Sequence, residues 1–254
     1  MDYLKVQVRT CVYMASILIA LAIYVFVGNS EVGTLRIIRL EEWFGFTASV
    51  YLLLALLPTP LYSVFPTTPG KTVYTRARRA IGISTFCFAF LHATISFFGL
   101  LDGFEGIPFL DTRYLLLLGS GAIALVILFL MAATSFDVAV RLLGSWWKRL
   151  HQFVYFAGIL ALAHTTLLGA HFGDPSAPLP LTFITLAFGF LVLEAARIDK
   201  KYLARGEGRA PRFSGRFVLC CIILTVLVMM LTSGDSSLHA GHSHNTATST
   251  PITP

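Results

Sequence analysis

Apolar segments long enough to cross a lipid bilayer recur along most of this chain. A spanning helix needs about 20 apolar residues, at ~1.5 Å of rise each, to cross a hydrocarbon core about 30 Å thick. We therefore predict an all-α fold, a polytopic bundle of membrane-spanning helices. Seven segments qualify as spans: 11–28, 43–62, 80–101, 114–134, 150–171, 179–196 and 216–233.

The composition agrees with a membrane protein. Hydrophobic residues make up 56% of the 254 residues and charged residues only 13%, whereas soluble domains carry roughly 25% charged residues. The predicted spans leave short loops and no room for a separate soluble domain. The cysteines all lie inside apolar segments, so we interpret them as small packing residues rather than disulfide or metal partners. They are Cys11, Cys87, Cys220 and Cys221.

The basic residues predict the orientation of the bundle. Of the 19 lysines and arginines, 16 lie in four alternating connections, 1–10, 63–79, 137–149 and 197–216. This alternation is the positive-inside pattern, which places the N-terminus in the cytoplasm and, with seven spans, the C-terminus outside. The net charge of +6 then reflects topology and contact with membrane lipid rather than nucleic-acid binding.

We divide the chain into four segments. Residues 1–42 hold the first span and an outer loop, to which we assign Glu41 and Glu42, and residues 43–200 form the helical core. Residues 201–233 comprise a basic loop and the seventh span. Residues 234–254 are polar and predicted to be disordered. This tail carries His239, His242 and His244, a spacing that can bind Cu²⁺, Zn²⁺ or Ni²⁺, although a flexible tail offers no fixed geometry.

Three histidines, His92, His151 and His164, lie within or at the ends of predicted spans, where an unsatisfied imidazole is costly. His92 follows Arg79 by 13 residues, and His164 follows His151 by 13 residues. Both are then ~20 Å along spans that run in the same direction, so they reach one level in the outer half of the membrane. Two neutral imidazoles that face each other at one depth can supply both axial ligands of a haem.

The third histidine, His151, lies at the cytoplasmic end of the span that carries His164, about 140° around the helix from it. At the level of His151 the third span carries Arg78 and Arg79 instead of a histidine. The pattern predicts one bis-histidine pair and leaves His151 as either a ligand of a second haem or an ordinary interfacial residue. For each histidine the structural alternative is a core residue that joins helices by hydrogen bonds.

Several motifs resemble the ferric reductase-like transmembrane family. In the third span, Arg78-Arg79-Ala-Ile-Gly-Ile precedes Phe88-Ala-Phe-Leu-His92. Farther along, Trp147-Lys-Arg-Leu-His151 precedes Ile159-Leu-Ala-Leu-Ala-His164. The likeness covers about residues 45–170. Within the family it is strongest to the haem-binding membrane subunits of bacterial methionine-sulfoxide reductase systems.

This resemblance implies a six-helix core in the bacterial inner membrane that carries electrons through haem b, with His92, His151 and His164 as the iron ligands. It implies a periplasmic molybdenum enzyme as the acceptor. The wider family holds two histidine pairs, whereas this chain has Arg78 and Arg79 in place of one inner histidine. The resemblance therefore leaves open whether the core holds one haem or two.

The electron donor must be a separate partner, because the sequence has no GxGxxG fingerprint and no flavin or nicotinamide domain. We expect a cytoplasmic flavin reductase or a quinone. Arg78 and Arg79 are candidates to hold haem propionates or the phosphate of FMN, and they are equally well explained as topology anchors.

Two other functions remain as alternatives. The first is a ferric or cupric reductase, which would share the haem core and give electrons directly to metal ions outside. The second is a cofactor-free transporter or scaffold. It is disfavoured because ion-coupled transporters usually hold a carboxylate deep in a span, and we expect none here.

Overall fold

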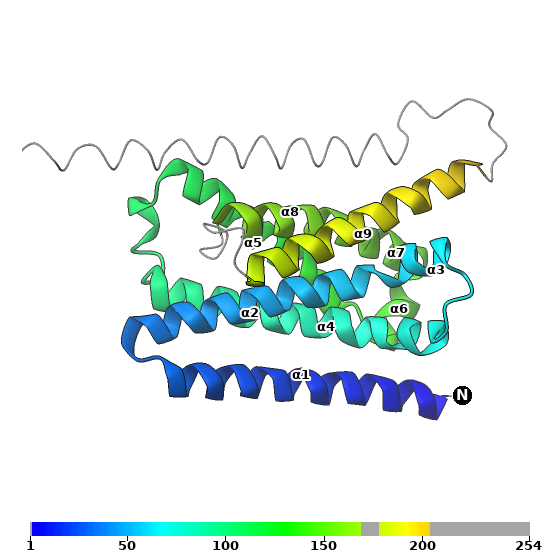
Figure 1. The fold of residues 1–254 in the computed structure, drawn as a ribbon, viewed down its shortest axis with the longest axis horizontal. Helices are drawn as coiled ribbons and strands as arrows, with labels where there is room; N and C mark the ends of the chain where they lie inside the picture. The colour runs from blue at the N-terminus through cyan, green and yellow to red at the C-terminus, as the bar shows by residue number, and fades with distance from the viewer. Residues whose placement is uncertain (1, 169–177, 204–254) are drawn as a thin grey trace, which may run out of the picture.

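The computed structural model describes residues 2–168 and 178–203, which form helices and no strand. Figure 1 shows the long helices lying side by side, with α1 at one edge of the bundle. In chain order the elements are α1 (Asp2–Ser30), α2 (Gly33–Leu56), α3 (Pro58–Val64), α4 (Lys71–Ile95), the π-helix η1 (Ser96–Leu100), the 3₁₀-helix η2 (Ile107–Phe109), α5 (Thr112–Ala133), α6 (Asp137–Leu143), α7 (Ser145–Gln152), α8 (Val154–Leu168) and α9 (Pro178–Leu203).

Six helical segments of the described chain are long and apolar enough to cross a membrane, which confirms the polytopic all-α prediction. Their bounds are Val6–Ser30, Gly33–Val64, Lys71–Leu100, Thr112–Ala133, Ser145–Leu168 and Pro180–Lys201. The predicted seventh span, 216–233, and the tail with His239, His242 and His244 lie outside the described residues. The predicted orientation stays a prediction.

Two spanning helices begin earlier than the hydropathy pattern predicted. Helix α2 begins at Gly33 and α4 at Lys71, so charged residues that the hydropathy pattern places in loops lie on helices instead. In α2 the charges offset each other, because Arg39 forms an ion pair of 3.0 Å with Glu42 one turn farther on. The assignment of Glu41 and Glu42 to an outer loop is therefore wrong, because both residues lie on the spanning helix α2.

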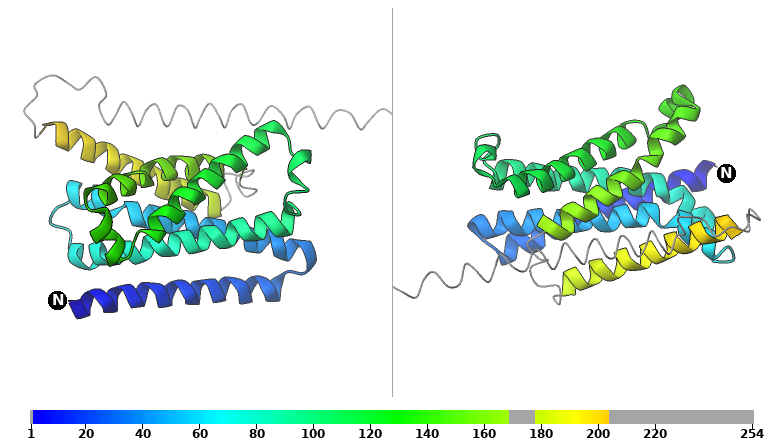
Figure 2. Two further views of the ribbon diagram at one scale, coloured as in Figure 1. Left: turned by 180° about the vertical axis from the view of Figure 1, so that it is seen from behind. Right: turned by 90° about the horizontal axis from the view of Figure 1, so that it is seen from above.

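Four helices form the centre of the bundle. Helix α2 packs most extensively on α4, and α5 on α8, while contacts of α4 with α5 and of α2 with α8 close the ring. Helix α1 packs on α4 and α2 from outside, and α9 packs on α3 and α2. Figure 2 shows α1 along one edge of this group in the left view and α9 along one edge in the right view. The four central helices are therefore the ones that can enclose a site.

A layer of buried aliphatic side chains crosses the centre of the ring. Leu52 and Leu56 of α2, Leu128 of α5 and Val154 of α8 form one cluster. Together they bury apolar surface from three of the four helices.

Two cysteines correct the sequence interpretation. Cys11 and Cys87 are free, but their side chains are exposed rather than packed in the core. On a spanning helix an exposed thiol meets lipid, where a small apolar side chain is well tolerated. Cys220 and Cys221 lie outside the described residues.

Candidate functional site

His92 continues the buried face of α4. The buried residues Ala77, Ile81, Ser84 and Phe88 recur at intervals of three or four residues, and His92 follows at the next interval. Residues at this spacing share one face of a helix. The local sequence of α4 therefore turns the imidazole of His92 into the bundle.

His164 holds the equivalent place on α8. Val154 and Ala157 are buried, and Ala161 packs against the same aliphatic cluster. His164 comes three residues after Ala161 on this inward face. Helices α4 and α8 do not follow each other in the chain, so only the tertiary fold brings their histidines together.

The imidazole rings of His92 and His164 lie close to each other between the central helices. Their centres are 6.0 Å apart, and their planes are nearly perpendicular, at 82°. A ligating imidazole nitrogen lies about 2 Å from a transition metal and about 1.1 Å from its own ring centre, which predicts about 6 Å between the centres of two opposed ligands. The observed separation matches that of two imidazoles that share one metal ion.

Both rings are oriented by the same kind of hydrogen bond. His92 Nδ1 lies 3.0 Å from the backbone carbonyl oxygen of Glu41, and His164 Nδ1 lies 3.0 Å from that of Leu117. Because a carbonyl oxygen only accepts, each Nδ1 carries the hydrogen and donates it. Each Nε2 then has a free lone pair, which is the form of histidine that binds a metal through Nε2.

Each imidazole packs against a glycine of a neighbouring helix. A Cβ atom at Gly45 of α2 would lie 2.7 Å from His92 Nδ1, and one at Gly121 of α5 would lie 2.6 Å from His164 Nδ1. Real Cβ atoms essentially never approach so closely. Each glycine stands four residues after the carbonyl that binds the ring, so α2 and α5 serve the two histidines in the same way.

A cavity of about 740 Å³ lies between the four central helices and includes both histidines in its wall. The rest of its lining is mainly apolar or small, with Gly45, Ala48, Thr85, Ala124, Leu128 and Ala161 among the lining residues. Sites for drug-sized ligands and cofactors typically have volumes of about 300–1,000 Å³. The cavity is therefore large enough for a cofactor, and its lining is mainly apolar.

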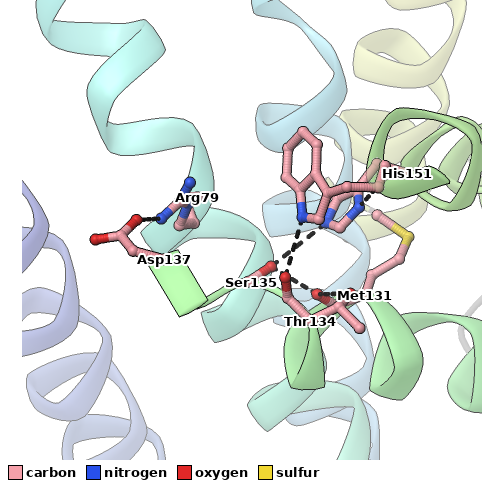
Figure 3. Close-up of polar contacts among 7 residues, drawn as sticks. Arg79, Met131, Thr134, Ser135, Asp137 and His151 are labelled. Atoms are coloured by element: carbon pink, nitrogen blue, oxygen red, sulfur yellow. Dashed lines mark hydrogen bonds and ion pairs between the residues drawn. The ribbon is translucent and has the colours of Figure 1, made fainter. Parts of the chain in front are cut away.

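His151 is in the last turn of α7 and is not among the residues that line this cavity. Figure 3 shows it beside Ser135 and Thr134. Its ring stacks on that of Trp147, with centres 3.9 Å apart. Its Nδ1 donates to the carbonyl of Trp147 at 3.0 Å, and its Nε2 lies 3.5 Å from Ser135 Oγ. Trp147 Nε1 in turn donates to the carbonyl of Thr134 at 3.0 Å. His151 thus has the same Nδ1–H form as the other two histidines, in a separate inner cluster.

Arg78 and Arg79 lie near this inner cluster and already have protein partners. Arg78 Nε donates to the carbonyl of Ala55 at 2.8 Å, which ties α4 to α2. Arg79 forms an ion pair of 2.5 Å with Asp137 at the start of α6, as Figure 3 shows. Both guanidinium groups are close enough to His151 to interact with it electrostatically.

Like Gly45 and Gly121, the site residue Glu41 was not identified from the sequence. Glu41 Oε1 lies 3.2 Å from His92 Nδ1, beside the carbonyl oxygen of the same residue. Glu41 is spaced from Gly45, Ala48 and Leu52 as residues on one face of a helix are. Because charged residues stand next to Glu41 in the sequence, the start of this helix was not recognised from hydropathy.

The comparison with known families agrees with this arrangement. Residues 44–162 match the family model of the ferric reductase like transmembrane component. The matched segment runs from α2 into α8, includes His92 and His151 and ends two residues before His164. No solved structure matches the chain. The six spanning helices found in the described residues, together with a segment similar to a ferric reductase transmembrane component, support an integral, multi-pass membrane protein.

The donor set of the cavity suits haem better than a bare metal ion. Among residues 2–168 and 178–203, no group of three or more histidine, cysteine, aspartate or glutamate side chains is placed to hold a metal. A protein site for a bare ion usually needs three or four such ligands. A porphyrin supplies four of the six iron ligands itself and needs only two from the protein, and His92 and His164 are the residues of this cavity that would hold it.

Proposed function

We propose that this protein carries electrons across the membrane through a b-type haem held by His92 and His164. The observation that carries the proposal is the close pair of imidazoles, with ring centres 6.0 Å apart and both Nδ1 atoms bound to backbone carbonyls. A pair that merely joined helices would have no need of matched tautomers and matched glycines. When bound, haem supplies a one-electron iron couple.

The chain's own residues would hold the cofactor and keep its surroundings dry. The Glu41 and Leu117 carbonyls keep the two Nε2 lone pairs available, and Gly45 and Gly121 leave room for the rings. The aliphatic cluster around Leu52 excludes water beneath the site. A dry, apolar surrounding and two imidazole ligands are the main factors by which a protein sets a haem's reduction potential.

We further propose that electrons enter at the end that carries His151, Arg78 and Arg79. A cytoplasmic flavin reductase or a quinone is the proposed donor, and FMN or a second haem at His151 is the proposed inner cofactor. Support comes from the Nδ1–H form of His151, which leaves its Nε2 as a possible ligand. The partners of the two arginines count against a cofactor held by those arginines alone.

For the acceptor we propose a protein on the outer side, as in the MsrQ (YedZ) group, whose membrane subunits pass electrons to a periplasmic molybdenum enzyme. The motifs around His92, His151 and His164 support this choice. Direct reduction of ferric or cupric ions would need the same core. Fast reduction of ferric citrate or Cu²⁺ by the purified, reduced protein would favour the metal reductase over the MsrQ-like function.

Reconstituted vesicles test the proposed function directly. We expect vesicles that contain the protein to reduce trapped ferricyanide when dithionite is added outside. The His164→Ala variant, which lacks one axial ligand, should be as slow as protein-free vesicles. Equal rates for the wild-type protein and the His164→Ala variant would contradict the proposal and favour a cofactor-free transporter or scaffold.

A further inference from the structure

The two candidate haem ligands differ in the acceptors at Nδ1, because only His92 has a carboxylate there. His92 Nδ1 has two acceptors from the same residue, the Glu41 carbonyl oxygen at 3.0 Å and the Glu41 carboxylate oxygen Oε1 at 3.2 Å. On the other side of the cavity, the corresponding residue is Leu117, which offers only its carbonyl. The carboxylate thus stands behind one ligand of an otherwise similar pair.

Glu41 is held in this place by the helix and is not a freely moving surface group. Its side chain is 20% exposed and that of His92 is 22% exposed, so the pair is mostly shielded from water. The carboxylate also lines the cavity and is close enough to His164 to interact with it electrostatically. A carboxylate in such a setting exerts a stronger field than one in bulk water.

We infer that Glu41 tunes the redox centre by placing a negative charge behind the His92 ligand. The inference rests on the proposed haem. A carboxylate that accepts the second N–H of a ligating histidine makes the imidazole a more basic ligand and fixes its orientation. Both this effect and the charge itself favour the oxidised iron, which carries one more positive charge. Glu41 therefore lowers the reduction potential and makes the site a stronger reductant toward its acceptor.

Coulomb's law gives the size of the effect. For a unit charge about 7 Å from a redox centre in a partly solvated site, removal of the charge changes an equilibrium constant by roughly ten- to fiftyfold. For a one-electron couple each tenfold change corresponds to about 59 mV, so the expected rise in midpoint potential is about 60 to 100 mV. The Glu41 carbonyl stays in place in any side-chain variant, so the ring keeps one hydrogen-bond acceptor.

The test is a redox titration of the purified full-length protein and its Glu41→Gln variant at one pH. Glutamine keeps the side-chain length and an accepting oxygen but removes the charge. We expect unchanged haem content, a midpoint potential higher by about 60 to 100 mV, and altered g-values of the ferric protein in electron paramagnetic resonance. A merely structural role of Glu41 would change neither the potential nor the g-values.

The adjacent residue provides the matched control. Glu42 has the same charge, lies one position along α2 and also lines the cavity, and its carboxylate binds Arg39 at 3.0 Å instead of a histidine. The Glu42→Gln variant should leave the g-values of the wild-type protein unchanged and shift the potential less than Glu41→Gln. Equal potentials for Glu41→Gln and the wild-type protein, with haem present in both, would overturn the inference alone. Absence of haem from the wild-type protein would overturn the proposed function itself.

Discussion

The glycine behind His164 gives the most quantitative prediction. In the Gly121→Ala variant the new methyl group would lie 2.6 Å from Nδ1 and 2.8 Å from Cε1 of His164, whereas ordinary contact begins at about 3.4 Å. The imidazole must then move by roughly 0.8 Å, while metal–ligand distances hold to within about ±0.2 Å. The displaced ring also loses its bond to the Leu117 carbonyl, which contributes on the order of 1 kcal/mol.

The predicted consequence is weaker haem binding without loss of the fold. Disturbing the group that orients a metal ligand typically lowers metal affinity by about 10–100-fold, or about 1.4–2.7 kcal/mol. The assay is the Soret absorbance per mole of purified protein, followed by titration of haem into the depleted variant. The melting temperature of the haem-free protein, measured alongside, shows whether the fold survives.

A neighbouring glycine on the same helix serves as the control. A Cβ atom at Gly119 of α5 would have no neighbour within 4 Å. The Gly119→Ala variant should therefore keep its haem, with a gain of up to about 1 kcal/mol from the better helix propensity of alanine. Full haem content and an unchanged low-spin spectrum in Gly121→Ala would refute the proposed close fit between α5 and His164.

Three further predictions concern the rest of the bundle. Ser16→Ala should lower the free energy of unfolding by about 1 kcal/mol, measured by thermal unfolding in detergent. The reason is that Ser16 Oγ donates to Ser84 Oγ at 2.9 Å and so joins α1 to α4. An unchanged stability would show that this hydrogen bond does not hold α1 in place. Arg79→Gln should cost less than about 1 kcal/mol in the same assay, since its partner Asp137 is 58% exposed; a larger loss would give the ion pair a greater structural role. Trp147→Leu should leave the haem at His164 in place, as judged by the Soret band, because Trp147 stacks on His151 outside the cavity. Loss of that band would show that the cluster around His151 affects haem binding in the cavity.

Much of the fold follows from hydropathy alone. Six of the predicted spans fall on the spanning helices, since in a bilayer the length and polarity of a segment decide whether it crosses. The starts of α2 and α4 could not be predicted this way. Ion pairs such as Arg39–Glu42 and Arg79–Asp137 offset charges that a hydropathy count treats as isolated.

The candidate site was only partly accessible from the sequence. Equal spacing along two parallel spans predicted that His92 and His164 share one depth, and the structure brings their rings to 6.0 Å. Spacing could not show which helices pack against the two imidazoles, because that depends on tertiary packing. Gly45, Gly121 and Glu41 therefore emerged only from the fold, although the four-residue interval between Glu41 and Gly45 is visible in the chain.

The central claim is that His92 and His164 bind one haem iron between them, and electron paramagnetic resonance of the oxidised protein tests it most directly. We predict a low-spin signal of two imidazole ligands in the wild-type protein, its loss in both His92→Ala and His164→Ala, and its retention in His151→Ala. A wild-type protein that takes up no haem, or a His164→Ala variant that keeps the wild-type signal, would contradict the account.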